Sequence, residues 1–111
     1  MKNWGPYHSY ILDLYKKYSE KRAKEIDPYK QLVLDEQKKL LVEIEYEYRT
    51  YLKGIGNDHG VRFLAYLSNK ALSLNKIKKN NKKDYMIPVY NGVDSLLQIV
   101  VKRFTKFRIE E

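Results

Sequence analysis

Apolar and aromatic residues recur at steps of three and four along four stretches of the chain, and helix-ending residues separate these stretches. Such steps place side chains on one face of an α-helix, whereas a half-buried strand requires strict alternation. The pattern therefore predicts amphipathic helices, each of which must bury its apolar face against another element. The predicted helices cover residues 7–24, 28–53, 59–79 and 88–107.

The predicted helix ends rest on capping chemistry. Asp27 suits the N-cap of the second helix, and Pro28 fits its first turn, where a missing N–H costs nothing. Gly54 is expected just beyond the end of that helix, in the left-handed conformation. Asn57 or Asp58 is expected to cap the third helix.

Four amphipathic helices joined by short turns predict an all-α fold, a compact antiparallel helical bundle of about four helices that forms a single domain over residues 1–111. The longest connection, residues 80–87, is the candidate for a mobile element. The residues expected to face the core are Trp4, Tyr7, Ile11, Leu14, Tyr15 and Tyr18, then Val33, Leu40, Ile44, Tyr48 and Tyr51, then Val61, Leu64, Leu67, Ala71, Leu72 and Leu74, and finally Val89, Val93, Leu96, Leu97, Val100, Phe104 and Phe107.

The net charge of +8 is concentrated in the second half of the chain. Residues 1–48 hold nine Lys/Arg and nine Asp/Glu, whereas residues 49–108 hold thirteen Lys/Arg and three Asp. A basic surface of this kind is typical of proteins that bind polyanions, most commonly RNA or DNA. The basic residues expected to bind nucleic acid are Arg49, Lys53, Arg62, Lys70, Lys102, Arg103 and Lys106.

The composition argues against several other classes of protein. The absence of cysteine excludes disulfides, zinc–thiolate clusters and thiol catalysis, and fits a reducing cytoplasm. The most apolar run, residues 96–101, is far too short to cross a bilayer, and the first residues lack the apolar core of a signal peptide. We therefore expect a cytoplasmic protein that has no membrane partner.

No pattern in the chain predicts catalysis or a cofactor. The spacing of Gly54, Gly56 and Gly60 differs from the dinucleotide fingerprint, and a helix precedes it instead of a strand, so helix termination and a turn explain these glycines. His8 and His59 are the only histidines, and no second type of metal ligand clusters with them. We expect a non-enzymatic protein with no metal, no cofactor and no small-molecule substrate.

The tyrosines have two interpretations. Tyr15, Tyr18, Tyr46, Tyr48 and Tyr51 could stack nucleic-acid bases, since aromatic rings on a basic surface bind single strands. Tyrosines along helix seams are more often core or boundary residues whose hydroxyl lies at the edge. The second interpretation is favoured.

Two stretches together resemble the small helical subunit of type III-B (Cmr-type) CRISPR–Cas RNA-guided effector complexes. Residues 48–51 and 60–71 are similar to the family's stretch that ends one helix and opens the next, and residues 96–107 are similar to its final helix, in the same order. The chain lacks the family's proline-containing turn and the tryptophan of its final helix. The region between the two stretches is also shorter than is usual in the family. The equivalent small subunit of another type III subtype fits the same residues.

The resemblance implies a non-catalytic subunit that stacks head to tail into a minor filament and holds the guide–target duplex by its phosphates. Its partners would be guide and target RNA and other subunits of the complex. The matching basic positions are Arg49, Arg62, Lys70, Lys102, Arg103 and Lys106. The acid-rich middle of the second helix, with Glu43, Glu45 and Glu47, is the predicted protein interface, because an acidic and a basic patch on one chain permit an open, heterologous contact.

Two other functions remain open from the sequence. A free-standing helical DNA- or RNA-binding protein, such as a viral or plasmid architectural factor, would share the basic surface. A small helical immunity or inhibitor protein would use the same patch to dock on a protein partner. The ordered pair of family-like stretches favours the effector subunit.

Overall fold

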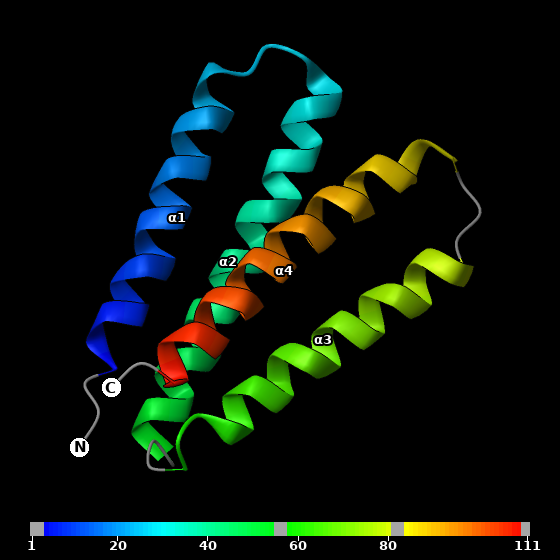
Figure 1. Ribbon diagram of the computed structural model, residues 1–111. Helices are drawn as coiled ribbons and strands as arrows, with labels where there is room; N and C mark the ends of the chain where they lie inside the picture. The colour runs from blue at the N-terminus through cyan, green and yellow to red at the C-terminus, as the bar shows by residue number, and fades with distance from the viewer. Residues whose placement is uncertain (1–3, 55–57, 81–83, 110–111) are drawn as a thin grey trace.

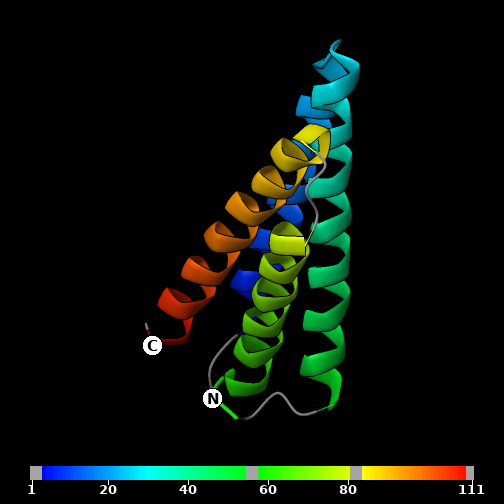
Figure 2. The same ribbon diagram turned by 90° about the vertical axis from the view of Figure 1, so that its right-hand side faces the viewer.

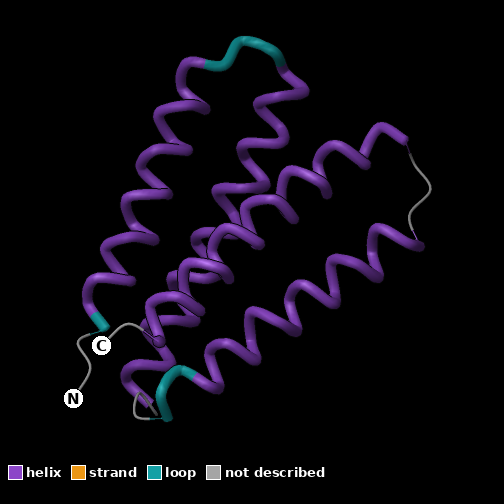
Figure 3. The backbone as a smooth tube through the Cα atoms, in the orientation of Figure 1, coloured by secondary structure: helices purple, strands orange, loops and turns teal. Residues whose placement is uncertain are grey.

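The computed structural model describes residues 4–54, 58–80 and 84–109. These residues form four helices, α1 (Gly5–Lys24), α2 (Pro28–Gly54), α3 (Val61–Asn80) and α4 (Ile87–Ile109), with a short 3₁₀ turn at Asp84–Met86 before α4. Figure 3 shows helices and loops in this part of the chain and no strand. The prediction of an all-α bundle of about four helices is confirmed.

Helices α1 and α2 form one antiparallel hairpin, and α3 and α4 form a second (Figure 1). The two hairpins pack against each other at one end. In Figure 1, α4 lies between α2 and α3, and α2 and α3 diverge from the loop that joins them. The 90° view of Figure 2 again shows α4 inclined to α2. The radius of gyration is 15.0 Å, against about 13 Å expected for a domain of this length. The divergence of the hairpins accounts for this more open shape.

Four buried aromatic rings, one from each helix, meet at the shared end. Tyr7, Tyr48, Phe63 and Phe104 are each at most 2% exposed. The ring centroids lie 4.9 Å apart for Tyr7 and Phe104, 5.0 Å for Tyr48 and Phe63, and 4.8 Å for Phe63 and Phe104. The inclined rings place edges against faces, the arrangement that the aromatic quadrupole favours. This four-ring cluster connects all four helices in one core.

The tyrosine hydroxyls of the core are satisfied by backbone groups. The Tyr7 hydroxyl donates to the Val100 carbonyl at 3.0 Å, and the Tyr48 hydroxyl donates to the Trp4 carbonyl at 2.8 Å. Burial raises the pKa of both phenols well above the usual value, which keeps them neutral donors. Tyr48 and Tyr51 are 0% and 8% exposed. The boundary interpretation therefore holds for these two residues, and base stacking by them is ruled out.

The buried face of α3 differs from the predicted one. Phe63, Leu67 and Leu74 face the core, whereas Val61 and Leu72 are 54% and 60% exposed. At 100° per residue the three buried positions share one side of the helix, and the other two lie more than a quarter turn away. The expectation for Val61 and Leu72 was wrong because several apolar residues lie on both sides of this helix.

The helix boundaries follow the predicted caps with two changes. The Asp27 carboxylate accepts from the Tyr29 amide at 2.9 Å, and the Asp58 carboxylate accepts from the Arg62 amide at 3.1 Å, so both predicted caps are confirmed. Gly54 is the last residue of α2 and does not adopt the left-handed conformation, which corrects that expectation. Gly56 and Asn57 lie outside the described residues. The connection expected at residues 80–87 is shorter than predicted, because Asn80 still belongs to α3 and Ile87 already begins α4; residues 81–83 lie outside the described part.

Gly60 is the glycine whose conformation the fold requires. It precedes α3 with φ +81°, a region that side chains rarely adopt. A Cβ at this position would lie 2.8 Å from the Phe104 ring and 3.1 Å from the Arg108 side chain. The start of α3 therefore approaches α4 more closely than any side chain on Gly60 would permit.

We expect Gly60→Ala to lower the free energy of unfolding by about 2–4 kcal/mol, because strain in the left-handed region adds to overpacking against Phe104. Urea unfolding followed by circular dichroism measures the change. Gly54→Ala is the matched control, since no atom lies within 4 Å of a Cβ at that helical position; it should be neutral or slightly stabilising. Equal losses in the two variants would contradict this account of Gly60.

Candidate nucleic-acid interface

Arg49, Arg62 and Lys70, which belong to the predicted basic residues, each have a carboxylate near them. The Arg49 guanidinium lies 2.6 Å from Glu45, and the Lys70 ammonium forms an ion pair with Glu43. Arg62 lies 4.0 Å from Asp58, at the limit of an ion pair. A cation that is paired within the chain has less to offer a phosphate, because the pair must be opened or shared.

The structure places these paired residues on different sides of α2. Glu43 and Glu45 are two residues apart, so their side chains point about 160° away from each other on a helix. Glu45 lies on the α1 side, where it also contacts His8 at 2.9 Å. Glu43 lies on the α3 side with Lys70. The seven predicted residues therefore do not form one continuous surface.

Lys102, Arg103 and Lys106 form the part of the prediction that the structure does bring together. All three are exposed and lie within two turns of α4. Asp94 is the single acid in α4, and it is directed toward α3, where it lies 3.6 Å from Lys78. The outward side of α4 is thus cationic, and Lys102 and Arg103 have no carboxylate of the described helix beside them.

A stripe of α1 extends this cationic surface. The Arg103 guanidinium lies over the Tyr10 ring, 5.2 Å from its centroid. Lys17 and Lys21 follow Tyr10 by seven and eleven residues, which keeps them on the same side of α1. Lys21 and Pro88, near the start of α4, line a common hollow, so this side of α1 borders both the end and the start of antiparallel α4. We call the surface of Lys17, Lys21, Lys102, Arg103 and Lys106 the α1–α4 face.

Sequence reasoning missed Lys17 and Lys21. They belong to the half of the chain whose charges cancel, so the charge count gives no reason to select them. Acids also lie close to them in the sequence: Asp13 one turn before Lys17, Glu20 one turn after it, and Glu25 one turn after Lys21. Their spacing from Tyr10 places them in the candidate site because Tyr10 contacts Arg103 of α4. That contact joins α1 to α4 and has no signal in the local sequence.

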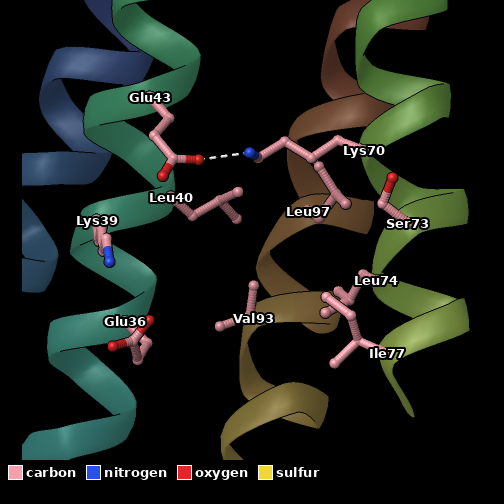
Figure 4. Close-up of a pocket in the computed structure, with 10 residues that line it drawn as sticks. All are labelled: Glu36, Lys39, Leu40, Glu43, Lys70, Ser73, Leu74, Ile77, Val93 and Leu97. Atoms are coloured by element: carbon pink, nitrogen blue, oxygen red, sulfur yellow. Dashed lines mark hydrogen bonds and ion pairs between the residues drawn. The ribbon is translucent and has the colours of Figure 1, made fainter. Parts of the chain in front are cut away.

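A cleft between α2 and α3 separates the hairpins, and α4 forms its floor (Figure 4). Its volume is about 220 Å³. Leu40, Leu74, Val93 and Leu97 supply apolar lining, and the Lys70–Glu43 ion pair crosses the cleft from one wall to the other. This cleft therefore holds one of the predicted cations together with one of the predicted interface acids.

The three acids of the predicted protein interface lie in two places. Glu47 lies one turn after Glu43 and so faces α3. Burial, followed by the charges of Glu47 and Glu43, raises the pKa of Tyr66 on α3 to about 12. Glu45 is partly buried, which opposes ionisation, but hydrogen bonds from His8 and Arg49 outweigh this and lower the pKa of its carboxyl. Glu45 is therefore an internal ion-pair partner.

Glu45 also lies at an exposed apolar groove between α1 and α2. Leu12, Tyr15 and Val42 line this groove and are exposed, so the expectation that Tyr15 faces the core was wrong. Tyr46, one turn after Val42 on α2, is exposed as well, and the Arg49 guanidinium lies 5.8 Å from its ring centroid. A contiguous exposed apolar surface of this kind is typical of contacts with other proteins.

The Asp58 carboxylate organises the turn before α3. It accepts hydrogen bonds from the Tyr51 hydroxyl, from the Gly60 amide at 3.2 Å and from the Arg62 amide at 3.1 Å. The Tyr51 bond contributes most to lowering the pKa of Asp58. Burial, followed by the hydrogen bond to Asp58 and then the charge of that carboxylate, raises the pKa of Tyr51 to about 12. The ionised carboxylate and the neutral phenol thus stabilise each other at neutral pH.

The lowered pKa of Asp58 predicts acid-sensitive stability. A carboxyl whose pKa is lower in the folded state than in the unfolded state stabilises the folded state at pH values above its ordinary pKa near 4. This stabilisation is lost as the pH falls through the folded-state pKa. Asp58→Asn should therefore be less stable than the wild type at pH 7 and should lose less stability between pH 5 and pH 2. Urea unfolding at a series of pH values measures both. Asp13→Asn, on an exposed part of α1, is the control; parallel pH curves for wild type and Asp58→Asn would contradict the assignment.

The described residues contain no group of three or more His, Asp or Glu side chains placed to hold a metal ion. His8 is engaged with Glu45, and the backbone carbonyl of His59 accepts from Arg108 at 2.6 Å. Over the same described ranges, no helix has the length and apolar character needed to cross a bilayer. Comparisons of the chain with protein-family models, with curated proteins and with solved structures found no match.

Proposed function

We propose that the protein is a non-catalytic small subunit of a type III CRISPR RNA-guided effector complex in the cytoplasm, and that it binds the phosphate backbone of guide and target RNA through the α1–α4 face. One observation carries the proposal. Lys102, Arg103 and Lys106 project from one side of α4, while the single acid of that helix, Asp94, is directed toward Lys78 on α3. The family-like stretches that contain these residues support the same function.

The chemistry of the face suits backbone contact. Lysine and arginine neutralise phosphates whatever the base sequence, and this term dominates sequence-independent affinity. Specificity would come from pairing between guide and target strands, so the protein needs only a rigid cationic surface. Helices α1 and α4 provide such a surface, because Tyr7 and Phe104 fix them to the same core.

The first test is the salt dependence of RNA binding. Affinity for a guide–target RNA duplex is measured by fluorescence anisotropy over a range of salt concentrations, for the wild type and for Lys102→Ala/Arg103→Ala/Lys106→Ala. Since log affinity falls with log salt in proportion to the phosphates contacted, the slope should become shallower by about 2–3 in the variant.

A matched control removes the same charge elsewhere. Arg49→Ala/Arg62→Ala/Lys70→Ala deletes three of the predicted cations that have a carboxylate near them in the chain. Its slope should stay near that of the wild type. If the control loses as much slope as the α4 variant, binding follows net charge and the assignment of the α1–α4 face fails.

We place the contact with neighbouring subunits at the apolar groove between α1 and α2. Leu12, Tyr15 and Val42 leave apolar area exposed there, and Glu45 adds an acid beside them. The α1–α4 face lies on another side of the molecule, so RNA and a protein neighbour could bind together. This arrangement permits head-to-tail stacking along an RNA duplex.

The second test is light scattering with RNA present. Leu12→Ser/Val42→Ser should abolish the stacked species and keep RNA binding, because it removes apolar contact area without changing charge. Val61→Ser/Leu72→Ser changes two exposed apolar residues of α3 and should stack as the wild type does. A wild type that binds RNA as a monomer at every concentration would instead favour a free-standing nucleic-acid-binding protein.

A further inference from the structure

A second hollow lies where the end of α1, the start of α2 and the start of α4 come together. Its volume is about 680 Å³, within the range of small-molecule sites, about 300–1,000 Å³. Tyr29, Val33, Leu34 and Pro88 supply an apolar lining. This hollow is distinct from the α2–α3 cleft and from the α1–α2 groove, with which it shares no lining residue.

The rim of the hollow is cationic. Lys21 and Lys24 come from the last turns of α1, and Lys30 comes from the first turn of α2. Within the described chain none of the three lysines forms an ion pair with a carboxylate. Three cationic side chains around an apolar lining favour an anion with an apolar body.

The acids nearby are engaged by the backbone. Glu25 lines the hollow, and its carboxylate accepts from the Asp27 amide at 3.2 Å. Asp27 caps α2 by accepting from the Tyr29 amide. Both carboxylates have structural roles at the turn but keep their charge, so three lysines and Glu25 together give the lining of the hollow a net positive charge.

Tyr29 adds an aromatic side chain to the lining of the hollow. Its hydroxyl is shielded from solvent and has no hydrogen-bond partner among the described residues. Because that hydroxyl cannot be reached from the open hollow, Tyr29 would contact a bound molecule through its ring. A nucleobase can stack on such a ring, which an alkyl chain cannot do.

We propose that this hollow binds one unpaired nucleotide, with its base against Tyr29 and Pro88 and its phosphate among Lys21, Lys24 and Lys30. A base has the flat surface that stacks on an aromatic ring, and a phosphate takes several cationic donors at once. Lys21 belongs to both this hollow and the α1–α4 face, so a strand held by that face leads toward the hollow. This proposal extends the proposed RNA-binding function. It rests on that function for the source of the nucleotide, which would be the bound RNA strand.

Binding of free nucleotides is measured first, by NMR titration of the full-length protein with AMP and with UMP. Adenosine and inorganic phosphate serve as probes that lack one part of the ligand, and each should bind at least tenfold more weakly than AMP. Lys24→Ala/Lys30→Ala should weaken AMP binding at least tenfold, and Tyr29→Leu should weaken it severalfold because it removes the ring on which the base stacks. Lys76→Ala/Lys79→Ala, on α3, should leave it unchanged.

RNA duplexes with and without a single unpaired terminal nucleotide give the second measurement. The wild type should bind the overhanging duplex several times more tightly, and Lys24→Ala/Lys30→Ala should lose this preference while binding the blunt duplex nearly as well as the wild type does.

AMP binding without any overhang preference would assign the hollow to free nucleotides. Binding of blunt duplex with neither AMP binding nor an overhang preference would overturn the hollow proposal alone. Failure to bind any RNA would overturn the proposed function itself. Tighter binding of octanoate than of AMP would assign the hollow to an apolar carboxylate and overturn the nucleotide.

Discussion

Tyr7, Tyr48, Phe63 and Phe104 connect the four helices at one end of the bundle, since each ring belongs to a different helix. Each is almost completely buried, and neighbouring centroids lie about 5 Å apart. Removing a buried ring of this size costs about 3–5 kcal/mol in typical proteins, a large part of the stability of a domain this small. The positions of all the surfaces described above follow from this contact.

Because the rings join the helices at one end, the two hairpins can diverge toward the other (Figure 1). The divergence leaves the α2–α3 cleft, which the Lys70–Glu43 ion pair crosses, and the hollow between α1, α2 and α4. These surfaces differ in whether their cationic side chains form ion pairs with carboxylates of the chain. Arg49 and Lys70 pair with carboxylates of α2, whereas Lys102 and Arg103 on the outer side of α4 face solvent without an acid of their own helix. An RNA-binding surface on α1 and α4 is the functional consequence that we propose.

The helices were predictable from local chemistry. Asp27 and Pro28 mark the start of α2, and the apolar steps of α4 lead directly to Leu96, Val100 and Phe104 in the core. Local patterns do not report which helices are neighbours. The burial of Phe63 in place of Val61 depends on where α3 meets the other rings, so periodicity alone could not select it.

The candidate site was predicted in part for the same reason. Lys102, Arg103 and Lys106 share one helix, so their spacing was enough to bring them together. Arg49 and Lys70 are on opposite sides of α2, which the charge count cannot show, and their pairing with Glu45 and Glu43 depends on the neighbouring helices. Lys17 and Lys21 joined the site through the Arg103–Tyr10 contact, a long-range relation with no signal in the local sequence.

The most direct test of the central claim is an NMR titration in which a guide–target RNA duplex is added to isotopically labelled protein. The account predicts that the largest amide shifts occur around Lys17, Lys21, Lys102, Arg103 and Lys106. Amides near the Lys70–Glu43 pair should change little. Shifts concentrated in the α2–α3 cleft, or spread evenly over all the basic residues, would contradict an RNA-binding surface formed by α1 and α4.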